Sequence, residues 1–235
     1  MRFGIVVFPG TWSDGDCYHV TKSVLGQNSR YIWHTDTDLS DIDCVVLPGG
    51  FSYGDYLRTG AIARFSPIMT RVAEFAAAGG PVLGICNGFQ ILLEAGLLPG
   101  AMRRNRGLKF ICEHVHARVE ETDTSFTRSA SVGQLLRMPI AHGEGNYYAD
   151  AETLETLEKN RQVVFRYADP NGRLDDRWNV NGSTAAIAGV CNSQRNVVGL
   201  MPHPERACES SIGSMDGRVV LESVVPSIAE RLSEA

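Results

Sequence analysis

The sequence predicts an α/β fold in which a mostly parallel central sheet lies between helices and antiparallel strands extend one edge. In the first half, short and uniformly apolar segments alternate with helix-like segments, which is typical of parallel strands buried on both faces. In the second half, strand-like segments are more polar and are separated by turn sequences such as Asn171-Gly172, which indicates antiparallel pairing. Because no linker or internal repeat is visible in the 235 residues, we expect a single domain over residues 1–235.

Local patterns define the individual elements. In the first half, apolar runs closed by glycine or proline predict strands, and longer segments with apolar positions at helical spacing predict helices. The predicted strands there are 3–8, 30–34, 44–47 and 82–85, and the predicted helices are 14–27, 67–78 and 89–95. In the second half the predicted strands are 108–119, 134–140, 184–190 and 197–201, followed by a helix over 216–232.

Composition and charge exclude several classes of protein. The formal net charge is −5, and no long cluster of Lys and Arg is present, so nucleic-acid binding is not expected. No apolar run is long enough to span a bilayer, and the N-terminal segment is typical of a first strand rather than a signal peptide. The six cysteines form no C-x-x-C pair, which predicts reduced thiols in a cytoplasmic protein.

The most informative segment runs from Gly84 through Cys86 to Gly88, where an apolar strand is expected to meet a helix. This G-x-C-x-G pattern is the thiol counterpart of the G-x-S-x-G nucleophile elbow, in which glycines let the strand and helix backbones approach closely. The turn would place the Cys86 thiol at the positive N-terminal end of the helix, where a thiolate is favoured. The alternative is that Cys86 is a small buried hydrophobic residue, as most free cysteines are.

Two further segments could supply the partners of a cysteine nucleophile. His203 and Glu205 flank a proline after an apolar strand, and the proline favours an extended backbone at His203. Glu205 could then orient one ring nitrogen while the other faces the thiol. Gly49 and Gly50 follow another apolar strand, and a backbone N–H there could form an oxyanion hole with the N–H of Asn87. Taken singly, the first segment could be a capping turn and the second a simple β-turn.

Together these segments resemble the class I, or triad-type, glutamine amidotransferases. The resemblance covers nearly the whole chain, and its motifs lie in residues 47–58, 84–90, 139–147 and 199–206. The first two of these segments are specific to a branch of the class that serves purine synthesis. The resemblance implies a flavodoxin-like three-layer sandwich that hydrolyses glutamine through a cysteine thioester. The chain departs from the family pattern at residues 9–17, where many relatives carry Pro-Gly-Ser-Asn-Cys-Asp.

The resemblance also assigns roles to individual residues. It implies a catalytic triad of Cys86, His203 and Glu205, with the backbone N–H groups of Gly50 and Asn87 as the oxyanion hole. The residues that it implies for binding or positioning the substrate are Gly49, Phe51, Gln90, His142, Gly143 and Glu144. Gln90 lies one helical turn beyond Cys86, so it could share the same face of the helix.

The chain shows no nucleotide-binding motif. Gly10 and Gly15 have the spacing of a phosphate loop, but Asp16 and Cys17 follow where Lys and Ser or Thr are required. We therefore expect no cofactor in this chain. Transfer of ammonia to an amide requires activation of that amide, and the resemblance implies a large synthetase subunit that holds ATP and magnesium, with a small accessory subunit. The loop at residues 51–65 is the candidate docking surface, although it could equally be a self-packed cap.

Other clusters give weaker signals. Cys112, His114 and His116 alternate along a predicted strand and could share one face, but no fourth ligand is evident, so no metal site is expected. Two other functions stay open. One is a different cysteine hydrolase on the same core, such as a γ-glutamyl hydrolase or an intracellular protease relative, although protease relatives usually carry a histidine where this chain has Asn87. The other is a flavin-binding domain that uses the turn at residues 10–15.

Overall fold

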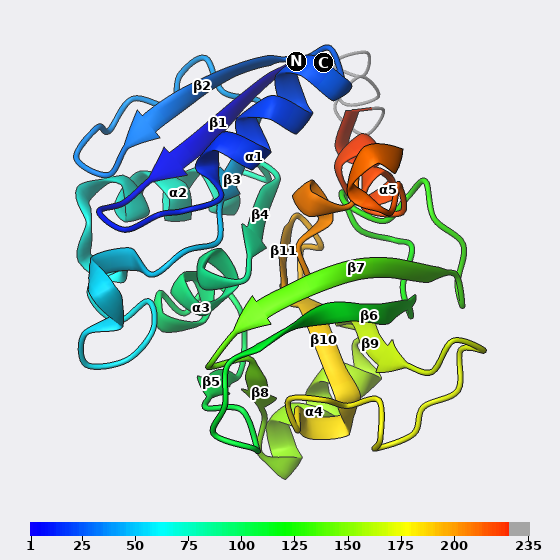
Figure 1. Ribbon diagram of the computed structural model, residues 1–235. Helices are drawn as coiled ribbons and strands as arrows, with labels where there is room; N and C mark the ends of the chain where they lie inside the picture. The colour runs from blue at the N-terminus through cyan, green and yellow to red at the C-terminus, as the bar shows by residue number, and fades with distance from the viewer. Residues whose placement is uncertain (226–235) are drawn as a thin grey trace.

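A nine-stranded mixed sheet with flanking helices forms the body of the protein (Figure 1). The computed structural model describes residues 1–225. The strand order is β2-β1-β3-β4-β11-β10-β9-β6-β7. The first five strands are parallel to one another, and they are β2 (Asn28–Trp33), β1 (Arg2–Val7), β3 (Cys44–Leu47), β4 (Val82–Ile85) and β11 (Val197–Leu200). The antiparallel extension consists of β10 (Ile187–Cys191), β9 (Val163–Ala168), β6 (Ile111–Val119) and β7 (Leu135–His142).

Helices and short turns connect these strands. The α-helices are α1 (Asp14–His19), α2 (Pro67–Ala77), α3 (Asn87–Glu94), α4 (Ala151–Lys159) and α5 (Arg218–Glu222). A π turn, η1 (Val20–Val24), continues α1, and the 3-10 turns are η2 (Ser52–Asp55), η3 (Ala63–Phe65), η4 (Thr184–Ala186), η5 (Pro204–Arg206) and η6 (Ser210–Ile212). A separate two-stranded sheet pairs β5 (Ala101–Arg103) with β8 (Asn146–Tyr148). None of the helices within residues 1–225 has both the length and the apolar character needed to cross a bilayer.

The predicted fold class is confirmed, including the position of the antiparallel strands. The parallel strands follow the order 2-1-3-4-5 of flavodoxin-like sheets, with β11 as the fifth strand. Several boundaries differ from the prediction, and β5, β8, β9 and α4 were not predicted. The strand expected at 184–190 begins only at Ile187, because positive φ angles at Ala185 and Ala186 interrupt the extended backbone. The helix expected at 14–27 ends in the π turn, and the strand expected at 108–119 begins at Ile111. The helix expected at 216–232 lies partly outside the described residues.

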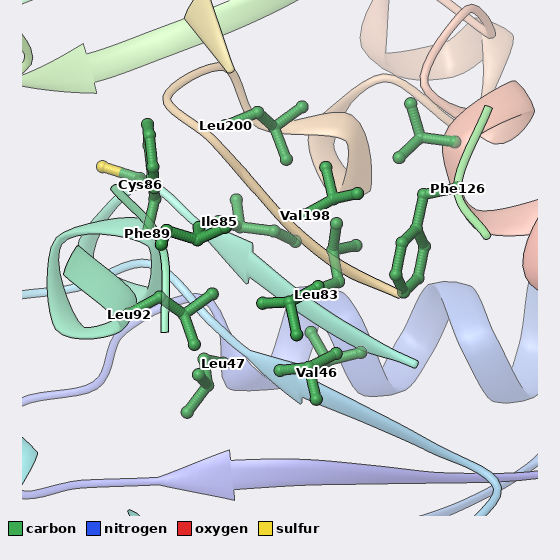
Figure 2. Close-up of a cluster of buried hydrophobic side chains, with 14 of the residues drawn as sticks. Val46, Leu47, Leu83, Ile85, Cys86, Phe89, Leu92, Phe126, Val198 and Leu200 are labelled. Carbon is green, nitrogen blue, oxygen red and sulfur yellow. The ribbon is translucent and has the colours of Figure 1, made fainter. Parts of the chain in front are cut away.

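The core between the parallel strands positions the carboxyl end of β4. Val46, Leu83 and Val198 lie side by side in register on β3, β4 and β11, and all three are fully buried. Figure 2 shows these side chains packed together, with the Cys86 sulfur at the margin of the cluster and pointing away from Leu83. The apolar strands therefore fix the position of Cys86 while leaving its sulfur outside the apolar cluster.

Close packing of α3 against the sheet depends on two glycines. A Cβ atom at Gly88 would lie 1.9 Å from the carbonyl oxygen of Leu47, so only glycine allows the first turn of α3 to rest on β3. A Cβ atom at Gly84 would lie 2.5 Å from the Leu92 side chain of the same helix. The predicted crowding of strand and helix around Cys86 is therefore confirmed.

Replacement of Leu83 by alanine should destabilise the whole domain core. The Leu83 side chain is fully buried, and its removal leaves a cavity between β3 and β11. We expect the free energy of unfolding to fall by about 2–5 kcal/mol, measured by urea denaturation. Val132, which is 66% exposed, is the control, and its replacement by alanine should change the free energy of unfolding by less than about 0.5 kcal/mol. Equal effects at the two positions would contradict this assignment of the core.

Candidate active site

Cys86 occupies a strained turn between β4 and α3. Its backbone has φ 50° and ψ −104°, a combination that residues with a side chain rarely adopt. The Cys86 N–H donates a hydrogen bond of 2.8 Å to the carbonyl oxygen of Leu200, and the Cys86 carbonyl accepts one of 3.1 Å from the Gln90 N–H. The predicted elbow is thus present, and its hydrogen bonds tie it both to α3 and to the end of β11.

His203 and Glu205 follow directly after β11, the strand that pairs with β4. His203 Nδ1 and Glu205 Oε1 are 2.7 Å apart, and the two residues are 3% and 2% exposed. His203 has an extended backbone, as predicted from the following proline. Glu205, however, lies in the 3-10 turn η5 rather than in a continuous extended segment. The pair is therefore formed by a tight turn, and not by the two-residue repeat of a strand.

The charges of this pair stabilise each other in a buried place. Burial alone lowers the pKa of His203, but the charge of Glu205 and the neighbouring Cys86 outweigh burial and raise it. Burial alone raises the pKa of Glu205, but the charge of His203 and the hydrogen bond between them outweigh burial and lower it. Both directions favour an imidazolium paired with a carboxylate.

His203 and Cys86 meet beside Gly49. A Cβ atom at Gly49 would lie 2.7 Å from His203 Cε1 and 3.4 Å from Cys86 Cβ, so both side chains pack against this glycine. His203 Nε2 is buried and makes no hydrogen bond of ordinary geometry, although the Cys86 side chain is close enough to raise the pKa of the ring. Catalytic hydrogen bonds of this kind are often long before substrate binds.

The segment that precedes α1 holds the end of β3 in place. Ser13 Oγ accepts a hydrogen bond of 2.8 Å from the Gly49 N–H, and the N–H groups of Trp12 and Ser13 donate to the Gly49 carbonyl. This support by Ser13 was not predicted. Residues 9–17 depart from the family pattern, so the resemblance assigned no role to them. Ser13 is fully buried, and the chain that forms the proposed oxyanion turn depends on it.

A cavity of about 260 Å³ opens beside Cys86. Its lining includes seven residues that the sequence predicted for the site, namely Gly50, Phe51, Cys86, Gln90, His142, Gly143 and Glu144. Four other predicted residues do not line the cavity, namely Gly49, Asn87, His203 and Glu205. Cys86, which does line it, directly precedes Asn87 in the chain and meets His203 beside Gly49. The cavity is slightly smaller than the roughly 300–1,000 Å³ of drug-sized ligand sites, which suits a compact metabolite.

Two predicted substrate residues are engaged with the protein itself. Gln90 donates from Nε2 to the Glu144 carbonyl and accepts at Oε1 from Asn87 Nδ2, at 2.9 Å. His142 Nδ1 lies 3.0 Å from Asn105 Oδ1. Gln90 therefore joins the start of α3 to the segment after β7 through both ends of its side-chain amide.

Four polar cavity residues were not predicted as site residues: Asp55, Thr59, Arg104 and Lys109. Asp55 and Thr59 lie in the 51–65 loop, which the sequence suggested as a docking surface or a self-packed cap, with only Phe51 of this loop expected to contact the substrate. A cavity wall built from three separate loops has no local sequence pattern. The available sequence signal was the charged residues of these loops, and charged residues are equally typical of solvent-exposed loops without a function.

Cys112 and His114 lie on exposed positions of β6, and His116 is half-buried. Within residues 1–225, no group of three or more His, Cys, Asp or Glu side chains is arranged to hold a metal ion.

Replacement of Glu205 by glutamine should change how stability depends on pH. Because the folded pKa of His203 is raised, its stabilising contribution is complete below its ordinary pKa of 6.5 and is lost as pH rises through the folded value. Because the folded pKa of Glu205 is lowered, its contribution is complete above 4.5 and is lost as pH falls. The wild type should exceed Glu205→Gln in free energy of unfolding most at about pH 5–6.5, with a smaller difference at about pH 9. Urea denaturation measures this, and a pH-independent difference would contradict the ion pair.

Comparison with known proteins gives the family. Residues 1–220 match the family model described as the CobB/CobQ-like glutamine amidotransferase domain. A phosphoribosylformylglycinamidine synthase subunit PurQ from Moorella thermoacetica is 59% identical over 225 residues, which cover 96% of this chain and 95% of that protein. The subunit of the same name from Acaryochloris marina is 55% identical over 228 residues, covering 97% of each chain.

Solved structures agree with this result. The structure of PurLQS from Thermotoga maritima contains a chain with a TM-score of 0.84 and 44% identity, covering 97% of this chain and 98% of that one. A putative GMP synthase component from Thermoplasma acidophilum has a TM-score of 0.65 at 14% identity, covering 99% of this chain and 96% of that one, which shows the shared fold alone. The chain therefore belongs to the CobB/CobQ-like glutamine amidotransferases and, within them, to the PurQ family.

Proposed function

We propose that Cys86, His203 and Glu205 are the catalytic triad with which this chain, a glutamine amidotransferase of the PurQ family, hydrolyses glutamine to glutamate and ammonia. The main support is the meeting of Cys86 and His203 beside Gly49, with Glu205 hydrogen-bonded to the far nitrogen of the ring. A nucleophile, a base and a group that orients the base are the parts that covalent catalysis requires.

The first half of the reaction forms a thioester. His203 Nε2 holds the proton of Cys86, so that the ring is an imidazolium, and the sulfur attacks the side-chain carbonyl carbon of glutamine. The N–H groups of Gly50 and Asn87 hold the oxyanion, and loss of one such donor typically raises the barrier by about 3 kcal/mol. His203 then donates its proton to the departing nitrogen, which leaves as ammonia, and a glutamyl thioester remains on Cys86.

The second half releases glutamate. His203, which became neutral at Nε2 when it protonated the departing nitrogen, removes a proton from a water molecule that attacks the thioester carbonyl. The tetrahedral intermediate collapses, the carbon–sulfur bond breaks, and the sulfur leaves as a thiolate beside the imidazolium. Glu205 holds the ring in one orientation and stabilises the imidazolium in both halves, because it is bonded to Nδ1 and lies buried with it.

The ammonia is used by a second subunit in this proposal. The relatives are named as subunits of phosphoribosylformylglycinamidine synthase, and PurLQS is named as an assembly. We infer that a large synthetase subunit, with a small accessory subunit, holds ATP and magnesium and converts formylglycinamide ribonucleotide to formylglycinamidine ribonucleotide in purine (IMP) biosynthesis. The 51–65 loop is the proposed docking surface, since it exposes Tyr56, Leu57 and Phe65 at 74%, 89% and 73%.

We also infer a single domain and a cytoplasmic location for this chain. One contiguous hydrophobic core joins both halves of the sheet, which supports a single domain over residues 1–235. None of the six cysteines, which all lie within residues 1–225, forms a disulfide, and this fits a reducing, cytoplasmic environment. The flavin alternative loses support because Gly10 packs against the Phe51 carbonyl, where a Cβ atom would lie at 2.4 Å.

Replacement of Cys86 by alanine tests the proposal. Glutamine-dependent synthesis by the complex should fall by about 10⁴-fold or more, because no covalent intermediate can form. Synthesis supported by added ammonium chloride should stay within about twofold of the wild type, because the synthetase site is unchanged. Both rates are measured as ADP formation by the assembled complex.

The matched control is the exposed Cys112, whose replacement by serine should leave both rates unchanged. Retention of glutamine-dependent synthesis by Cys86→Ala would refute the triad. Loss of the ammonium-dependent rate as well would indicate that Cys86 has a structural role.

A further inference from the structure

The buried polar atoms without partners gather at one place in the molecule. Within residues 1–225, side-chain atoms of this kind occur on Ser52, Asp55, His142, His203 and Glu205. His203 and Glu205 belong to the triad, Asp55 and His142 line the cavity beside Cys86, and the Ser52 N–H is bonded to Asn87 of the elbow. Unpaired buried groups are costly, so their gathering around one cavity indicates that a ligand completes them.

Asp55 is held in the cavity wall without a partner for Oδ1. Its loop is strained, with positive φ angles at Tyr53, Asp55 and Leu57. The loop is also anchored, because Arg58 forms two hydrogen bonds of 2.6 and 2.7 Å to Glu94. Asp55 therefore stays in the wall despite the strain of its backbone.

A second carboxyl group lies near Asp55. Glu144 lines the same cavity, and its Oε2 accepts a hydrogen bond of 3.4 Å from Thr59 Oγ1. Burial and the neighbouring Glu144 together raise the pKa of Asp55 to about 6. Two partly buried carboxyl groups that repel each other favour a cationic ligand between them.

Basic groups without partners line the same cavity. Arg104 and Lys109 are exposed cavity residues, and neither forms an ion pair with any residue in the described part of the chain. The cavity thus offers free acidic groups and free basic groups to one small ligand. A zwitterion, with an ammonium and a carboxylate on one carbon, matches both sets.

His142 provides an acceptor that is independent of these charges. The Asn105 amide nitrogen donates to two backbone carbonyls, so Asn105 Oδ1 is the acceptor toward His142 Nδ1. The proton of the neutral ring is therefore on Nδ1, and burial keeps the ring neutral by lowering its pKa to about 4. Nε2 is left as a buried, unpartnered acceptor on a side chain that is only 3% exposed.

We propose that Asp55 is the residue that makes this site specific for free glutamine, by binding the α-ammonium group together with Glu144. Arg104 and Lys109 bind the α-carboxylate, and His142 Nε2 accepts a hydrogen bond from the carboxamide N–H₂ next to Cys86. This inference rests on the proposed glutaminase function. It also excludes glutamine within a peptide, which has neither charge at its α-carbon.

Asp55→Asn in the assembled complex tests the inference, with L-glutamine compared against its analogue that lacks the α-amino group, glutaric acid monoamide. The wild type should prefer L-glutamine by at least about 100-fold in kcat/KM. The variant should lose about 10- to 100-fold with L-glutamine, mainly through KM, and change less than about threefold with the analogue. Alkylation of Cys86 by iodoacetamide at the wild-type rate shows that the site is folded.

Glu94→Gln is the matched control, because Glu94 anchors the same loop through Arg58 but does not line the cavity. Any effect of this variant should fall equally on both substrates. An equal loss with both substrates in Asp55→Asn, or no loss with either, overturns the inference while the proposed function stands. Failure of the wild-type complex to consume L-glutamine, although Cys86 is alkylated normally, refutes the proposed function itself.

Discussion

The parallel pairing of β4 with β11 is the constraint on which the site depends. The strands run in register from Val82 and Val197 to Ile85 and Leu200, and the hydrogen bond from Cys86 N–H to the Leu200 carbonyl continues the ladder by one residue. Parallel strands have their carboxyl ends at the same end of the sheet. Cys86 and His203, more than a hundred positions apart in sequence, thereby lie together at the same end of the sheet.

Several features around the cavity lower the stability of the folded protein. The core between the parallel strands is apolar and closely packed. Around the cavity, by contrast, the backbones of Cys86 and of residues 53–57 are strained, and several buried polar groups have no hydrogen-bond partner. Local rules of folding are commonly violated where a ligand is to be bound. The hydrogen bond between His203 and Glu205 offsets the free-energy cost of burying the two charges, and it also holds the His203 ring in its orientation toward Cys86.

The sequence was sufficient for the fold class, for the parallel strands and for the turn at Cys86, but β5, β8, β9 and α4 were not predicted. Uniformly apolar strands identified the parallel sheet, because its strands are buried on both faces. The two glycines around Cys86 identified the turn, because strand and helix approach too closely there for a side chain. The role of Ser13 and the cavity positions of Asp55, Arg104 and Lys109 were not predictable in this way. These residues meet through loops, where contacts depend on the whole tertiary structure and leave no periodic pattern. The 3-10 turn at Glu205 was missed because an extended segment would have paired the same two side chains.

The proposed reaction requires a covalent bond between glutamine and the sulfur of Cys86. Peptide mass spectrometry of the complex, quenched in acid during glutamine turnover, tests this requirement most directly. We predict a glutamyl adduct on the peptide that contains Cys86, removed by hydroxylamine as a thioester should be. An adduct on another residue, or glutamate release with no adduct on Cys86 at any quench time, would contradict the account.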